Sequence, residues 1–140
     1  MSEADVQLFQ SWAEQAEQLA VAEDLLGFWY ERVWAEDIDH LAIQGAVDDH
    51  GPIIGRDAMR AYVADWYEMF PDLTISFEEI TDAGPGRVVA IAHIAGTAKA
   101  SGVPVDMRFS VLYTIRDGKI ARGREYMTMD EALRAAGLPE

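Results

Sequence analysis

The stretch GRDAMRAYVADWYEMFPDLTISFEEIT, residues 55–81, holds a change of periodicity that decides the fold class. Before Pro71 the apolar residues recur at the spacing of one helix face, and after it they alternate with period two, as in a half-buried strand. Proline lacks the amide hydrogen that a helix interior needs, so we expect the helix to end at Pro71. The pattern predicts a strand over residues 73–81, preceded by a helix whose inner face carries Met59, Tyr62, Val63, Trp66 and Phe70.

Downstream, three further runs alternate with period two and predict strands over residues 87–100, 103–115 and 119–128. The last two runs flank an Asp-Gly dipeptide, which is typical of a tight hairpin turn. Thr128 and Glu131 have the T-x-x-E spacing of a capping box, which predicts a short C-terminal helix. Because the strands follow one another directly, we expect an antiparallel meander.

Upstream, the sequence predicts two amphipathic helices and a short strand. The helical patterns cover residues 6–20 and 25–33, and the run LAIQGAV, residues 41–47, predicts the strand. Helices that precede a set of strands are typical of an α+β fold. A chain of this length is expected to form one domain over residues 1–140.

The composition excludes several classes of function. The formal net charge is −14, which disfavours binding to nucleic acid phosphates. The absence of cysteine excludes disulfides, thiolate metal sites and a cysteine nucleophile. The N-terminus has no signal-peptide pattern, and no apolar run approaches the roughly 20 residues of a membrane span. We therefore expect a cytoplasmic protein with no membrane partner.

Three segments carry a resemblance to a known family: GPIIGRDAMRAYVADWYEMFPDL, GTAKASG and IRDGKIARGREYMTMDEALRAAGL. Together they resemble the SnoaL-like branch of the nuclear-transport-factor-2-like superfamily, over residues 20–138. The resemblance implies a cone, in which a curved antiparallel sheet wraps around the N-terminal helices and leaves an apolar pocket. It also implies a small apolar ligand and a homodimer packed through the outer face of the sheet. No cofactor is expected, because the sequence has no glycine-rich phosphate loop, no lysine in a Schiff-base context and no metal-ligand spacing. The superfamily includes ketosteroid-isomerase-like enzymes, polyketide cyclases and non-catalytic binding domains, so the fold alone assigns no reaction.

One position departs from the cyclases of this branch. Their general base is a carboxylate near the end of the last strand, and the matching residue here is Thr128. Threonine cannot take a proton from carbon at neutral pH, which counts against cyclase chemistry of that type. A structural role as the cap of the final helix explains Thr128 equally well.

The cluster DDH at residues 48–50 is the first candidate site. Ketosteroid-isomerase-like enzymes place an aspartate base in this region, and because strand residues alternate in direction, only one of Asp48 and Asp49 is expected to face inward. Asp49 is the catalytic candidate, although a polar turn explains the cluster more simply. A metal site is not expected, because adjacent residues rarely converge on one ion.

The other titratable candidates lie within predicted strands. His93 would be an acid or base if its face lines the cone; if it faces outward, it belongs to a dimer interface or is simply hydrogen-bonded. Arg108 and Glu125 either pair across the sheet or face the pocket, where Glu125 would be a base and Arg108 an anchor for an anion or oxyanion. His40 is expected at the solvated end of the second helix. The candidate ligand-binding aromatic residues are Trp29, Tyr30, Tyr62, Trp66, Tyr113 and Tyr126.

Two hypotheses for function follow. The first is a protein with a mostly apolar pocket that acts as a cofactor-free acid/base enzyme, of isomerase, cyclase or hydrolase type, on a hydrophobic polycyclic or ketone-like substrate. The second is a non-catalytic ligand-binding or dimerisation module. A sheltered carboxylate or imidazole within hydrogen-bond reach of a pocket group would favour the enzyme.

Overall fold

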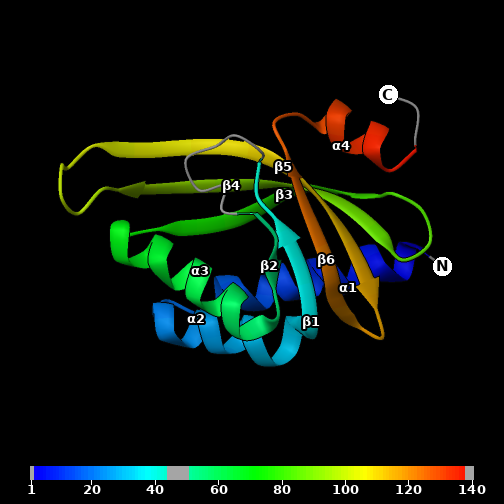
Figure 1. Cartoon of the computed structure of the whole chain (residues 1–140), viewed down its shortest axis with the longest axis horizontal. Helices are drawn as coiled ribbons and strands as arrows, with labels where there is room; N and C mark the ends of the chain where they lie inside the picture. Colours follow the sequence, from blue (N-terminus) through cyan, green and yellow to red (C-terminus); the bar gives the residue numbers. More distant parts are fainter. Residues whose placement is uncertain (1, 44–50, 138–140) are drawn as a thin grey trace.

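The computed structural model describes residues 2–43 and 51–137, and these form an α+β fold around one curved sheet (Figure 1). The predicted antiparallel meander is confirmed, since each of four consecutive strands pairs with the next. These strands are β3 (Thr74–Asp82), β4 (Arg87–Thr97), β5 (Pro104–Arg116) and β6 (Lys119–Tyr126).

Two further strands extend the sheet beyond the meander. β1 (Trp34–Leu41) pairs in parallel with β6, and the short β2 (Ile53–Ile54) pairs with β1, which gives a six-stranded mixed sheet of order β2-β1-β6-β5-β4-β3. The strand predicted over residues 41–47 overlaps β1 only at Leu41, because β1 begins at Trp34, and residues 44–47 fall outside the described residues. Only in the second half of WAEDIDHL do the buried Ile38 and His40 alternate with partly buried residues, and the acidic residues of the segment conceal this pattern.

The helices lie on both sides of the sheet (Figure 1). On the inner face lie α1 (Ser2–Glu17), α2 (Ala22–Phe28), the π-helical turn η1 (Trp29–Val33) and α3 (Arg56–Met69). The short helix α4 (Met129–Ala135) covers part of the outer face. Val88 of β4 belongs to the inner core with α1, whereas the next residue, Val89, packs against α4. The sheet is therefore apolar on both faces where these helices cover it.

The local signals at the ends of these elements agree with the sequence predictions. Helix α3 ends at Met69, just before Pro71. Asp117 and Gly118 both have positive φ, of 52° and 75°, as the predicted tight hairpin turn requires. The Thr128 hydroxyl accepts a hydrogen bond from the Glu131 amide at 3.2 Å, which confirms the predicted cap.

Irregular pairing bends the sheet. The register shifts between Glu78 and Thr81 in β3, and again between Thr114 and Ile115 in β5. Such bulges increase the local twist of a strand. The curved sheet wraps around the inner helices. Among the described residues, no helix has the length and the apolar character needed to cross a membrane.

Candidate functional site

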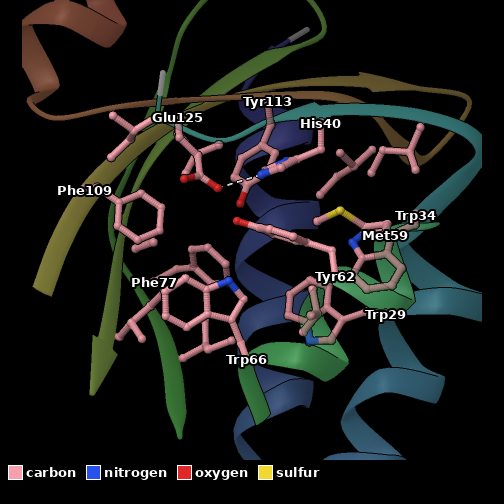
Figure 2. A pocket seen from close by; sticks show the side chains of 18 of the residues that line it. Trp29, Trp34, His40, Met59, Tyr62, Trp66, Phe77, Phe109, Tyr113 and Glu125 are labelled. Carbon is pink, nitrogen blue, oxygen red and sulfur yellow. Dashed lines mark hydrogen bonds and ion pairs between the residues drawn. The ribbon is translucent and has the colours of Figure 1, made fainter. Parts of the chain in front are cut away.

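A cavity of about 150 Å³ lies between the inner face of the sheet and the helical layer (Figure 2). Alternation along the strands supplies one wall, because every second residue of a strand points to the same face. Helix α3 and the turn η1 supply the opposite wall. The lining residues are mostly aromatic or aliphatic: Trp29, Trp34, Ile38, His40, Ile43, Met59, Tyr62, Val63, Trp66, Tyr67, Ile75, Phe77, Ala92, Ile94, Met107, Phe109, Val111, Tyr113, Ile120 and Glu125.

A buried imidazole–carboxylate pair breaks this apolar lining. The Nε2 atom of His40 lies 2.6 Å from Oε2 of Glu125, and the two side chains are only 4% and 9% exposed. The two residues are 85 positions apart in the sequence, and the parallel pairing of β1 with β6 brings them together. Desolvation offsets most of the attraction within a buried ion pair, so stability alone does not account for this placement.

Gly123 has no side chain, and this leaves the space that the imidazole of His40 occupies. His40 lies opposite Gly123 in the sheet, and a Cβ atom at Gly123 would lie 2.5 Å from Nδ1 of His40. That distance is well inside van der Waals contact. Nδ1 is itself buried and has no hydrogen-bond partner in the structure as described. Nε2 is therefore the ring nitrogen that forms a hydrogen bond, and Glu125 is its partner.

Two phenol groups lie beside the pair. Figure 2 shows the hydroxyl ends of Tyr62 and Tyr113 directed toward the region of His40 and Glu125. Burial, and then the charge of Glu125, raise the pKa of Tyr113 above its ordinary value. A phenol with a raised pKa keeps its proton at neutral pH, so the Tyr113 hydroxyl remains a hydrogen-bond donor.

Glu125, as well as four of the six aromatic candidates, Trp29, Tyr62, Trp66 and Tyr113, line the cavity as the pocket hypothesis expected. Glu125 is also the carboxylate of the last strand, three positions before Thr128. The side chain of Thr128 caps α4. The last strand thus places a carboxylate in the cavity at a residue that the family pattern alone did not indicate.

His93 and Arg108 lie on the opposite face of the sheet from the cavity, so the pocket role considered for each is wrong, and His93 takes the outward, hydrogen-bonded alternative. Residues on either side of His93 line the cavity, and alternation turns His93 outward. Its Nε2 atom lies 2.8 Å from Oδ1 of Asp106, while Nε of Arg108 donates to Oε1 of Glu78 at 3.0 Å. The hydrogen bond from Arg108 lowers the pKa of the Glu78 carboxyl. Arg108 and Glu125 do not pair across the sheet, because they point to opposite faces.

Tyr30 and Tyr126 also lie outside the cavity. The Tyr30 hydroxyl donates to Oδ1 of Asp57 at 2.5 Å, and the Arg56 guanidinium lies 4.4 Å from its ring centroid. These contacts join η1 to α3. Tyr126 packs on the outer face, in the cluster with α4.

The expectation for His40 is wrong, and that for Asp48 and Asp49 cannot be compared with the structure. His40 is 3% exposed and lies within β1, not at the end of a helix. The alternation of Ile38 and His40 with two aspartates was the signal that could have found it. Asp48 and Asp49 fall outside the described residues. Within the described part of the chain, no group of three His, Asp or Glu residues is arranged to hold a metal ion.

Solved structures with the same fold come from several bacteria. A Jannaschia sp. CCS1 protein classed with the SnoaL-like polyketide cyclases is 19% identical, with a TM-score of 0.69, over 96% of this chain and 92% of that one. An NTF2-like protein from Burkholderia pseudomallei is 15% identical, with a TM-score of 0.67, over 91% and 93%. A Mycobacterium tuberculosis protein, solved in complex with estradiol-17β-hemisuccinate, is 22% identical, with a TM-score of 0.64, over 85% and 95%. At these identities the likeness shows a shared fold.

The sequence itself identifies the family. No curated protein matches it significantly. The family model described as the SnoaL-like domain matches residues 20–123, which is more than half of the chain. That match includes β1, α3 and most of the meander. The chain therefore belongs to the SnoaL-like domain family, within the NTF2-like and ketosteroid-isomerase-like fold.

Proposed function

We propose that this chain binds a small, flat, mostly apolar molecule in the cavity and transfers a proton on it without a cofactor. Glu125 is the base, and His40 is the residue that positions it. The observation that carries the proposal is the His40–Glu125 pair, a sheltered carboxylate in a pocket otherwise lined by apolar and aromatic groups. Isomerisation or cyclisation of a ketone-like substrate is the reaction class that fits.

The carboxylate suits the role of base better than the imidazole does. Nδ1 of His40 lies against the backbone at Gly123 with no room for a ligand atom, and Nε2 is engaged by Glu125. Glu125 uses one oxygen, Oε2, for His40, which leaves Oε1 to accept a proton. A positioned carboxylate in a pocket of low polarity is an effective general base.

The proton-transfer step needs a hydrogen-bond donor that stabilises the negative charge developing on the substrate oxygen. When Glu125 removes a proton from the carbon next to a carbonyl, the electrons of the C–H bond form an enolate, and its oxygen becomes negative. The Tyr113 hydroxyl, whose pKa burial keeps high, can donate a hydrogen bond to that oxygen. Returning the proton from Glu125 to another carbon completes an isomerisation and restores the carboxylate.

The ligand of one structural relative supports the class of molecule. The Mycobacterium tuberculosis protein was crystallised with a steroid derivative. That compound joins apolar rings to polar oxygens, and the lining of the present cavity likewise combines apolar walls with a few polar groups.

Hydrogen–deuterium exchange of a ketone tests the proposal directly. 2-Indanone in D₂O exchanges its acidic protons slowly in buffer, and the exchange can be followed by proton NMR. We expect the wild-type protein to accelerate exchange and Glu125→Gln to lose the acceleration by about 100-fold or more. Glu36→Gln, which alters an exposed glutamate outside the cavity, is the matched control. Binding without any acceleration by the wild type would instead assign the pocket to a non-catalytic binding module.

A further inference from the structure

The volume of the cavity limits the size of the part of the ligand that it encloses, whereas the polarity of the cavity lining limits only the chemical class of the ligand. The cavity measures about 150 Å³. An engineered protein cavity of about this volume, lined by apolar side chains, takes up one benzene molecule. A four-ring steroid is several times larger than benzene. The cavity is partly open to solvent, so it encloses only part of a steroid and leaves the other rings outside.

Packed aromatic rings close the inner end of the cavity. Phe77 meets Phe9 edge to face, with ring centroids 5.1 Å apart, and it also contacts Trp29 at 5.9 Å. Phe9 lies 5.1 Å from Tyr113 and is fully buried in the core. A longer ligand could extend in this direction only by separating these rings. The inner end is thus fixed by the core itself.

The polar groups fix where an oxygen of the ligand belongs. The pair of His40 and Glu125 and the hydroxyls of Tyr62 and Tyr113 lie together in the cavity (Figure 2). A ligand oxygen buried against the apolar walls would lose its hydrogen bonds with water and gain none in return. The same oxygen beside Glu125 and Tyr113 would find both an acceptor and a donor.

We infer that the cavity encloses one aromatic ring or two small fused rings of its ligand, and that this enclosed part carries a hydroxyl or carbonyl oxygen against Glu125 and Tyr113. The placement of the oxygen rests on the proposed function. The limit on size rests on the cavity alone.

Three phenols of increasing size test the limit: phenol, 2-naphthol and estradiol share one hydroxyl-bearing aromatic ring. Trp29, Trp34 and Trp66 line the cavity, so quenching of tryptophan fluorescence reports binding, with calorimetry as confirmation. In an unrestricted apolar site, affinity rises with the apolar area that is buried, so estradiol would bind best. We expect estradiol to gain nothing over 2-naphthol, because its further rings lie outside the enclosed volume and bury little apolar area. An affinity for estradiol about tenfold or more above that for 2-naphthol would overturn the inference.

Enlarging the inner end provides a second test. Phe77→Ala removes the ring at the centre of the aromatic contacts, and we expect it to raise the affinity for estradiol relative to 2-naphthol by about tenfold. Phe77→Leu is the milder variant if the alanine variant does not fold. Phe28→Ala truncates a partly buried phenylalanine that does not line the cavity, and it should leave the ratio unchanged. An unchanged ratio in both Phe77 variants would contradict the role of this ring.

Glu125→Gln separates the two proposals. If estradiol gains nothing over 2-naphthol but this variant binds 2-naphthol as tightly as wild type, the size limit stands and the assigned contact with Glu125 fails. If the variant weakens binding of every phenol but estradiol still binds about tenfold or more tightly than 2-naphthol, the contact stands and the size limit fails.

Discussion

Each face of the sheet carries a histidine paired with a carboxylate, and the two pairs differ chiefly in their surroundings. On the outer face, His93 lies 2.8 Å from Asp106, and the side chains are 22% and 66% exposed. On the inner face, His40 lies 2.6 Å from Glu125, and the side chains are 4% and 9% exposed. Water and salt screen the first pair, whereas the second has an aromatic cavity around it. The same two chemical groups therefore form a surface contact on one face and a candidate acid/base centre on the other.

Removing the inner imidazole should have the largest effect. His40→Ala leaves the Glu125 carboxylate buried without its partner, and breaking such a pair costs about 3–5 kcal/mol. Urea denaturation measures this loss in the free energy of unfolding. The variant His40→Ala/Glu125→Leu should recover much of it, because the unpaired charge is gone. A loss below about 1 kcal/mol in His40→Ala, as expected for a surface ion pair, would show that the inner and outer pairs contribute equally to the free energy of unfolding.

Adding one methyl group at Gly123 should break the inner pair without altering either partner. Its Cβ would overlap Nδ1 of His40, so we expect Gly123→Ala to displace the ring and to destabilise the fold by about 1–3 kcal/mol. The specific sign is the loss of a slowly exchanging, downfield imidazole N–H proton in the NMR spectrum. Gly27→Ala, in helix α2 with no atom near its added Cβ, is the control and should be neutral or slightly stabilising. Retention of the downfield proton in Gly123→Ala would show that the His40 imidazole can keep its hydrogen bond to Glu125 in a shifted position.

High pH should weaken the inner face selectively. Burial raises the pKa of Tyr113 in the folded state above the ordinary value near 10, so the unfolded chain ionises first as pH rises. The contribution of this residue is complete below pH 10 and declines above it, by up to about 1.4 kcal/mol per pH unit. Denaturation curves between pH 8 and pH 11 measure the slope, and Tyr113→Phe should reduce it. An identical slope in the two proteins would place the alkaline sensitivity elsewhere, for example at Tyr67, whose pKa burial also raises.

The outer pair should give the smallest effect. Because His93 and Asp106 are in contact with solvent, we expect His93→Ala to change the free energy of unfolding by about 1 kcal/mol or less. Added salt should reduce even this effect, and the 2-indanone exchange rate should not change. A loss of exchange activity in His93→Ala would show that the outer face takes part in the chemistry.

Local patterns predicted most of the fold, and the reasons for the misses are physical. The helix before Pro71 and the four meander strands follow from periodicity, because each packs against a neighbour that is close in sequence. β1 was misplaced because it is rich in acidic residues and finds its partner β6 far along the chain. Parallel pairing of this kind leaves no turn signal between the strands.

The direction of His93 could not be predicted, because β4 is apolar on both faces. Val88 and Ala90 pack toward the inner helices, while Val89 packs toward α4. Alternation identifies two faces but does not say which lines a cavity when both are covered. The pairing of His40 with Glu125 depends on the register of β1 against β6, and that register is a property of the whole sheet.

The bare backbone at Gly123 also provides a test that needs only sequences of relatives. A histidine on the first strand and a G-x-E triplet on the last, here His40 and Gly123-Arg124-Glu125, form one three-part signature in the parallel register. Since any side chain at the glycine position would displace the imidazole, the three residues are expected to be retained or lost together. Family members that carry all three would share the buried pair, and those that lack the glycine would need a different arrangement for their chemistry.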